Sequence, residues 1–195
     1  MIQPIELPEP NKKGAISLEE AIVKRRSVRQ FSSQTLTPSQ ISQLLWAAQG
    51  LTDAMGLRTT PSAGARYALE IYMIDDRGVF HYHPDTHALS THAVGDLRMD
   101  VCRAALGQDS ILQAPSTMVL AAVFDRIAER YGRERAPRYV HMEVGHAAQN
   151  VLLQAQALGL GAVPIGAFED EVLHAVLTLP TDHKSLYLIP VGHPR

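Results

Sequence analysis

One stretch of the sequence, Thr117–Phe124, constrains the fold more than any other. Its residues are almost all apolar, so it lacks the alternation of apolar and polar positions expected of a strand with one face in water. A strand of this composition has to be covered on both faces. We therefore predict a central strand of a sheet, with further layers packed against each side of it.

Signals for helix starts occur twice before this strand. Ser17–Glu20 and Thr37–Gln40 are both spaced as capping boxes, in which the first and last side chains accept bonds from backbone N–H groups of the opening turn. The first predicts a helix that ends near Lys24–Ser27. The second predicts a helix that stops at Gly50, because glycine is common where helices end.

The longest helical pattern follows the central strand. Apolar residues recur at helical spacing through Arg138–Leu158, and Gly159 closes the pattern. Shorter helices are predicted from Asp96 to Ala105 and from Asp170 to Leu177. We interpret the charged stretch 127–138 as an exposed excursion, and residues 85–100 as a variable loop.

Further strands are predicted around these helices. Leu69–Ile74 and Val79–Tyr82 are joined by a turn-forming Asp-Asp-Arg-Gly, as in a hairpin. Ala162–Phe168 is expected to be a short strand or a strand that ends in a turn, and Leu186–Val191 is the last strand. Helices and strands mix without strict βα alternation, so we expect an α+β fold rather than a doubly wound one. We assign residues 1–16 to an N-terminal extension and residues 17–195 to a single domain.

The composition argues against several classes of function. The net charge is -2 and no lysine- or arginine-rich run occurs, so we expect neither nucleic acid nor a membrane as a partner. No apolar stretch approaches the roughly 20 residues that cross a bilayer, and the first residues do not resemble a signal peptide. Cys102 is the only cysteine, so neither an intrachain disulfide nor a cysteine-based metal site is expected. We expect a cytoplasmic protein.

The first candidate site comprises Arg25, Arg26, Ser27 and Arg29. A guanidinium group presents a planar fork of donors that matches two phosphate oxygens, and a hydroxyl adds a further donor. The segment therefore has the composition of a phosphate-binding site. The alternative is that arginines at the end of a helix complement the helix dipole and face water.

The second candidate site comprises Pro61, Ser62, Ala63 and Gly64. Small residues allow the backbone to approach a flat ligand closely, and Ser62 and the nearby Arg66 carry groups that orient a ligand. The alternative is a plain loop that leads into the next strand.

A third segment, Gly159–Phe168, offers a backbone with little side-chain bulk, which suits an aromatic cofactor. Its Gly-x-Gly is not a dinucleotide fingerprint, because it follows a helix, precedes a strand and lacks the third glycine. Among the histidines, His81 and His83 share a strand face, and His141 and His146 lie five apart on a helix. None has the spacing of a zinc site, so no metal is expected, and surface or hydrogen-bonded histidines are favoured.

The order of these segments along the chain resembles the nitroreductase superfamily. The likeness extends from about residue 18 to the end, and its blocks are R-R-S-x-R-x-F, P-S-x-G-x-R-Y, E-x-G-H-A-A-Q-N, G-L-G-x-V-P-I-G-A-F and P-V-G-x-P-R. The middle blocks are similar to the SagB-type (thiazole/oxazole-forming) dehydrogenase branch. The resemblance implies an FMN-dependent α+β fold with a central, mostly antiparallel sheet flanked by helices, in an intertwined homodimer with FMN at the interface.

The resemblance also implies which residues bind FMN. The side chains that would hold its phosphate and ribityl chain are Arg25, Arg26, Ser27, Arg29 and Arg195. The partner subunit would line the flavin with Pro61, Ser62, Ala63 and Gly64. The polar edge of the flavin would meet Gln108. The backbone passing beside the isoalloxazine ring would be that of Pro164, Ile165, Gly166 and Ala167.

Two residues would act in catalysis according to the same resemblance. The backbone N–H of Gly166 would meet the flavin N5, at a place where many relatives have glutamate. Tyr131 would be a proton donor. Its neighbour Arg130 stands where azoline-oxidising relatives have lysine, and arginine cannot act as a base near neutral pH. The alternative is that Tyr131 is an exposed aromatic residue in a loop.

The expected reaction is a ping-pong cycle. NADH or NADPH would donate hydride to the flavin, and an acceptor such as a nitroaromatic or a quinone would then take the electrons. Two alternatives stay open. One is an azoline dehydrogenase of peptide modification, against which the missing lysine counts. The other is a flavin-binding module without turnover.

Overall fold

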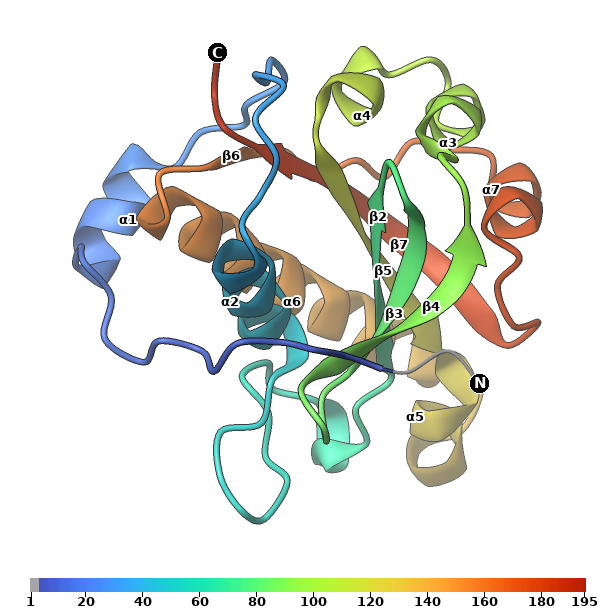
Figure 1. Ribbon diagram of the computed structural model, residues 1–195. Helices are drawn as coiled ribbons and strands as arrows, with labels where there is room; N and C mark the ends of the chain where they lie inside the picture. The colour runs from blue at the N-terminus through green and yellow to red at the C-terminus, as the bar shows by residue number, and fades with distance from the viewer. Residues whose placement is uncertain (1–3) are drawn as a thin grey trace.

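The fold was obtained as a computed structural model, which describes residues 4–195 (Figure 1). In this part of the chain the strands form one sheet of seven, in the order β1-β4-β3-β2-β5-β7-β6, and each neighbouring pair is antiparallel. Their bounds are β1 Ile5–Glu6, β2 Leu69–Asp75, β3 Gly78–His83, β4 Ala88–Val94, β5 Ser116–Val123, β6 Gly161–Ala162 and β7 His183–Gly192. The predicted mostly antiparallel sheet is confirmed.

The central strand is β5, as the apolar run predicts. It pairs with β2 along one edge and with β7 along the other, and all of its residues are buried. Its side chains alternate between two separate cores, with Met118 and Leu120 in one and Val119 and Ala121 in the other. Each face of the sheet therefore needs its own layer of helices.

Helices supply both layers, which completes the predicted α+β architecture. Their bounds are α1 Leu18–Lys24, α2 Pro38–Gln49, α3 Arg98–Ala104, α4 Asp109–Gln113, α5 Phe124–Tyr131, α6 Ala136–Ala157 and α7 Asp170–Leu177, with a 3-10 turn, η1, at Ala63–Ala65. Side chains of α2, α5 and α6 fill the core on one face, and those of α3, α4 and α7 fill the core on the other (Figure 1). No helix among residues 4–195 is long and apolar enough to cross a membrane.

The two predicted capping boxes differ in outcome. At α2 the box is complete, because the Thr37 side chain accepts from the N–H of Gln40 at 3.2 Å and Gln40 Oε1 accepts from the N–H of Thr37 at 2.9 Å. At α1 only the first half forms. Ser17 Oγ accepts from the N–H of Glu20, but the Glu20 carboxylate pairs with Lys24 at 2.6 Å instead of turning back. An ion pair one turn along the helix competes with the second capping bond.

Two strands were not predicted, and one is shorter than predicted. Part of the expected loop 85–100 is β4, which pairs with β3, and Ile5–Glu6 in the N-terminal extension pairs with β4. Polar residues in β4 hide its pattern in the sequence. The strand predicted over Ala162–Phe168 is reduced to β6 and an isolated bridge at Ile165, because Pro164 has no N–H to donate.

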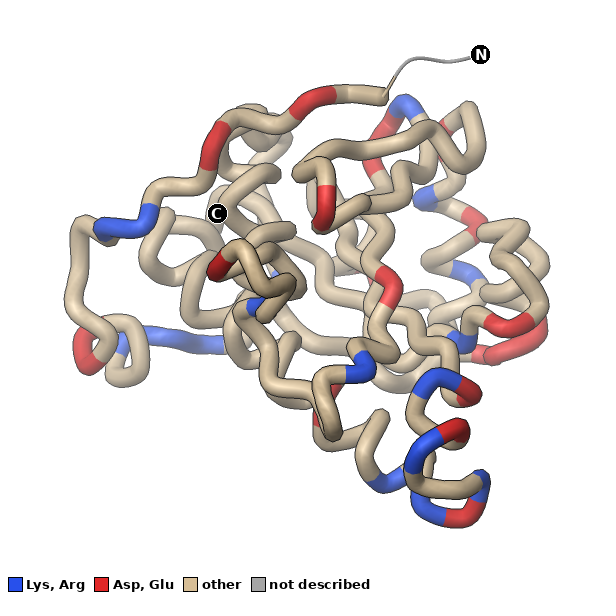
Figure 2. Tube along the Cα trace, turned by 90° about the horizontal axis from the view of Figure 1, so that it is seen from below, with Lys and Arg blue, Asp and Glu red and all other residues tan. Residues whose placement is uncertain are grey.

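The interpretation of 127–138 as an exposed excursion is wrong for its first part. Residues up to Tyr131 belong to α5, and Ile127 is completely buried against α6 and the sheet. The misreading has a clear cause, since charges of both signs alternate along α5 and the following turn (Figure 2). Apolar residues at helical spacing attach the helix to the core, namely Phe124, Ile127, Ala128 and Tyr131.

Replacing Ile127 with alanine tests this attachment. The change should lower the free energy of unfolding by about 2–5 kcal/mol, because it leaves a cavity in a completely buried site. Urea unfolding of the purified protein gives the measurement. Val172→Ala, at a half-exposed position of α7, is the control and should change stability by no more than about 0.5 kcal/mol. Equal effects of the two changes would mean that α5 is not attached through Ile127.

Candidate active site

The arginine segment after α1 lies against β6 and the C-terminal residues. The N–H of Val28 donates to the carbonyl of Ala162 at 3.1 Å, and the N–H of Arg195 donates to the carbonyl of Gln30 at 3.2 Å. A side chain at Gly161 would collide with Val28, whose Cβ would lie 2.6 Å away. This close packing brings the predicted phosphate-binding residues and Arg195 to one end of the molecule (Figure 1).

The arginines of this segment are not equivalent. Arg26 donates from Nη1 to the carbonyls of Val23 and Arg25, at 2.8 and 2.7 Å, and so satisfies the end of α1. Arg25, Arg29 and Arg195 form no ion pair within the described residues. The helix-end alternative therefore accounts for Arg26, whereas the other guanidinium groups stay available for an anion.

The segment Pro164–Ala167 continues directly from β6 and is fixed at both ends. Ile165 and Leu188 exchange backbone hydrogen bonds of 2.8 and 2.9 Å, and Gln108 Nε2 donates to the carbonyl of Ala167 at 3.0 Å. Gly166 between them is exposed, and its N–H has no backbone partner in the described part of the chain. An exposed backbone N–H between two fixed neighbours is suited to orient an acceptor atom of a ligand.

The second predicted segment, Pro61–Gly64, leads into η1 at the other end of α6. Ser62 Oγ donates to Glu143 Oε2 at 2.6 Å and accepts from the N–H of Tyr67 at 2.8 Å. Gly64 has φ +61°, and a Cβ there would lie 2.8 Å from Tyr131 Oη. Glycine is thus needed at this position both for its backbone conformation and for its lack of a side chain.

The residues after Gly64 hold an unusual backbone conformation. Ala65 and Tyr67 have φ of 52° and 48°, in the left-handed region that residues with a side chain seldom adopt. The turn is held by hydrogen bonds to Tyr67, whose hydroxyl accepts from the N–H of Arg58 and whose carbonyl accepts from Arg126 Nη1. Strain of this kind gathers at ligand-binding turns, because the surrounding structure has to enforce it.

Tyr131 lies beside this turn, at the end of α5. The ring centroid of Tyr131 is 4.8 Å from that of Tyr139, and the guanidinium of Arg130 lies 5.8 Å from the Tyr131 ring centroid. The side chain is half-buried against the core. The alternative of an exposed aromatic residue in a loop is therefore wrong, because α5 extends to this residue and packs it on α6.

Glu143 is a buried acid that was not among the predicted site residues. It is 1% exposed and holds Ser62 from the inner face of α6. Burial raises the pKa of the Glu143 carboxyl, although the hydrogen bond from Ser62 opposes the rise. The signal in the sequence was an acid within the apolar stripe that also carries Val140, Val144 and Ala147.

The predicted flavin residues thus form two groups that one chain does not bring together. Arg25–Arg29, Gln108, Pro164–Ala167 and Arg195 lie around β6, whereas Pro61–Gly64 and Tyr131 lie near the start of α6. Ser62 meets α6 at Glu143, 14 residues before its end at Ala157. At 1.5 Å per residue this separation is about 21 Å.

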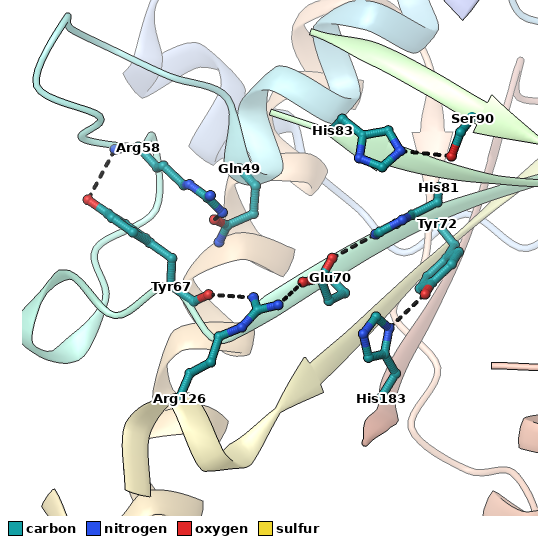
Figure 3. Close-up of polar contacts among 10 residues, drawn as sticks. All are labelled: Gln49, Arg58, Tyr67, Glu70, Tyr72, His81, His83, Ser90, Arg126 and His183. Carbon is teal, nitrogen blue, oxygen red and sulfur yellow. Dashed lines mark hydrogen bonds and ion pairs between the residues drawn. The ribbon is translucent and has the colours of Figure 1, made fainter. Parts of the chain in front are cut away.

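A polar cluster on the sheet brings several further titratable groups together (Figure 3). Glu70 bonds to Arg126 and, at 2.6 Å, to His81 Nε2, and Tyr72 Oη lies 2.6 Å from His183 Nδ1. Burial alone would raise the pKa of Glu70, but hydrogen bonds from His81 and Arg126 lower it to about 2. Burial lowers the pKa of His183 and raises that of Tyr72. In the described residues no three such groups are placed to hold a metal ion.

Glu143→Gln tests the buried acid, because glutamine keeps an acceptor for Ser62 and removes the titration. The raised pKa means that the folded chain keeps this proton to higher pH than the unfolded chain does. Stability from this group is therefore present below about pH 4.3 and is lost as the pH rises through the folded pKa. Urea unfolding at successive pH values should show a flatter decline for the variant than for the wild type. The exposed Glu134→Gln should follow the wild-type curve, and a variant curve parallel to the wild type would contradict the assignment.

Comparison with known proteins identifies the family of this chain. The model of the Nitroreductase family matches residues 22–193. A protein of Methanocaldococcus jannaschii, MJ1384, whose name assigns it provisionally to the nitroreductases, is 43% identical over 194 residues, which cover 96% of this chain and 95% of that protein. The trifolitoxin-processing protein TfxB of Rhizobium leguminosarum is 26% identical over 71% of this chain, and the match spans 42% of its own length.

Solved structures give the same result for the fold. A nitroreductase-like protein of Ralstonia eutropha superposes with a TM-score of 0.89 at 29% identity, over 98% of this chain and 90% of that one. The NADPH:FMN oxidoreductase of Vibrio harveyi, solved with NAD+, superposes with a TM-score of 0.69 at 21% identity, over 91% of this chain and 68% of that one. Since the family model covers nearly the whole sequence and the fold agrees with it, this chain belongs to the nitroreductase family.

Proposed function

We propose that this protein is an FMN-dependent oxidoreductase that uses NADH or NADPH to reduce small acceptors such as nitroaromatics and quinones. The proposal rests on two features that both lie around β6. The guanidinium groups there have no acid partner, and the N–H of Gly166 has no backbone partner in the described residues. The guanidinium groups suit a phosphate, and the free N–H suits the edge of a flavin ring. Both occur within one end of a nitroreductase fold.

The residues at this end fit the phosphate of FMN. The proposed phosphate contacts are Arg25, Arg29 and Arg195, whose guanidinium groups form no ion pair in the described residues, and Ser27, whose hydroxyl adds a donor. Arginine binds phosphate oxygens through paired donors. Arg26 is left out of the set, since its guanidinium group already satisfies the carbonyls at the end of α1.

The residues at the same end also fit the ring. Bound FMN would supply the acceptance and release of hydride, and the protein would supply binding and orientation. Gly166 offers its N–H to the ring, Ile165 fixes the backbone through Leu188, and Gln108 holds the carbonyl of Ala167. A Cβ at Gly166 would meet only the Tyr187 ring, at 3.6 Å, so packing does not require a glycine here. We assign the function of this position to its backbone N–H.

A second copy of the chain would complete the site. Ser62 meets α6 at Glu143, about 21 Å along the helix from its end at Ala157, and Thr60 meets it at Asn150, so the turn lies away from the end of α6 that leads to β6. We propose a homodimer in which each flavin meets β6 of one copy and this turn of the other. Tyr131, held beside Gly64, would enter the same site with its hydroxyl as a proton donor.

The likeness to the trifolitoxin-processing protein favours a second candidate, an azoline dehydrogenase of the SagB type. Arg130 counts against it, because a guanidinium group keeps its proton and provides no base. We therefore place the reductase first.

The first test is an anaerobic visible spectrum of the purified protein before and after addition of NADPH and then NADH. We expect flavin absorbance that bleaches with at least one donor and returns when a quinone or a nitroaromatic is added. A protein without flavin would contradict the whole proposal. Bound flavin that neither donor reduces would exclude the reductase and favour the azoline dehydrogenase or a binding module.

The dimeric site can be tested by complementation. Arg25→Gln with Arg29→Gln removes the phosphate contacts, and Pro61→Glu places a charge on the exposed turn, so each homodimer should lose FMN. The mixed dimer, isolated through two different affinity tags, contains one intact site and one doubly altered site. It should hold about one FMN per two chains. A mixed dimer without flavin would mean that both segments act within one chain.

A further inference from the structure

The proposed reaction gives no task to Glu143, the buried acid of α6. Its side chain is 1% exposed and lies on the helix face that also carries Val140, Val144 and Ala147. Burial disfavours the charged form of a carboxyl group, and a glutamine or an apolar residue at this position would avoid that cost. Stability therefore gives no reason for an acid here.

The hydrogen bonds of Glu143 lead instead to the Pro61–Gly64 turn. Ser62 Oγ donates to Glu143 Oε2 at 2.6 Å and accepts from the N–H of Tyr67 at 2.8 Å. One hydroxyl thus joins the buried acid to both ends of the segment from Ser62 to Tyr67. Since a hydroxyl has a single proton, its orientation is fixed as long as Glu143 is the acceptor.

The two ends of this segment are held differently. At the far end, the hydroxyl of Tyr67 accepts from the N–H of Arg58, and its carbonyl accepts from Arg126 Nη1 at 3.0 Å (Figure 3). At the near end, the bond between Ser62 and Glu143 is the only one that joins residues 61–64 to α6 within the described chain. The polar attachment of the turn to this helix is therefore a single hydrogen bond.

The strength of that bond depends on the charge of Glu143, because a hydrogen bond to an ionised carboxylate is about twice as strong as one between neutral groups. Burial raises the pKa of the Glu143 carboxyl. The groups that oppose the rise are the hydroxyl of Ser62, the backbone N–H groups of Ala68 and Leu69, and the charged side chain of Arg58. A proton on Glu143 therefore weakens the hold on Ser62, and it does so at a higher pH than for an exposed glutamate.

The other side of the turn faces outward. Pro61 and Gly64 are exposed, and the titratable groups that reach the turn from α5 are Arg130 and Tyr131, which both lie against Gly64. Glu143 holds the turn from inside, so the outward surface is left to a ligand.

We propose that Glu143 is a positioning residue of the flavin site, which acts through Ser62 to hold the Pro61–Gly64 turn in the shape that meets FMN on the other copy. This role rests on the function proposed for the site, because it requires that the turn lines FMN. The affinity for FMN then depends on whether Glu143 is ionised, and it falls when Glu143 takes up a proton.

The test measures FMN binding by the apoprotein from about pH 5 to about pH 8, through the quenching of FMN fluorescence. The phosphate of FMN itself titrates near about pH 6, so the dissociation constants of variant and wild type are compared as a ratio at each pH. Glu143→Gln should bind FMN about fivefold more weakly at the alkaline end and nearly as well as the wild type at the acid end. The exposed Glu134→Gln should match the wild type at every pH.

A second comparison shows whether Glu143 acts through Ser62. Ser62→Ala removes the hydroxyl, so adding Glu143→Gln to it should change the FMN dissociation constant by less than about twofold. The apoprotein also gives a readout without flavin, because the amide proton of Tyr67 is donated to Ser62. The NMR signal of this proton should shift with pH in the wild type and lose that shift in Glu143→Gln.

Three results would overturn this role for Glu143. They are a ratio that does not change with pH in Glu143→Gln, an undiminished effect of Glu143→Gln in the Ser62→Ala background, and a Tyr67 signal that titrates alike in variant and wild type. A wild-type protein that binds no FMN at any pH would overturn the proposed function itself. If Glu143→Gln fails to fold, Ser62→Ala carries the test, because its ratio to the wild type should also fall toward the acid end.

Discussion

The burial of β5 on both faces is the constraint on which the rest of this molecule depends. A strand with no face toward water needs a helical layer on each side, and α6 provides the largest part of one layer. That helix is 22 residues long, so it extends about 33 Å across the sheet. Its length separates the Pro61–Gly64 turn from the segment around β6. The second copy of the chain that we propose for the flavin site would thus follow from how the core is covered.

The arginines of this protein differ in the partners that their guanidinium groups have. Arg26 serves the end of a helix, Arg126 balances a buried glutamate, and Arg77 and Arg98 hold neighbouring aspartates. The arginines around β6 and Arg58 lack such partners in the described residues. A guanidinium group keeps its charge at all ordinary pH values, so an arginine that the fold holds without an acid partner is suited to bind an anion. The phosphate contacts proposed around β6 follow from that principle.

The Pro61–Gly64 turn follows Arg58 along the chain and belongs to the proposed flavin site. Glu143 holds the turn from α6 through Ser62, and the N–H of Tyr67 donates to the same serine. Arg58 precedes the turn, and its N–H donates to the Tyr67 hydroxyl. Ala65 and Tyr67, just after the turn, have positive φ and store strain that the surrounding bonds must maintain. A segment held in this way keeps a defined shape, which a flat ligand requires of any surface it packs against.

The sequence by itself determined the local features: the central strand, the starts of α1 and α2, the long helix, and the composition and order of the segments that resemble a flavin site. Each depends on residues near one another in the chain, where periodicity and capping act. It did not reveal β4, whose polar residues obscure the alternation, or α5, whose apolar positions lie among charges of both signs. Only the tertiary structure decided that Ser62 meets Glu143, 81 residues away, that Arg58 has no acid partner, and that the two flavin segments lie apart. These are facts about which distant side chains face each other, and only the packing of helices on the sheet determines them.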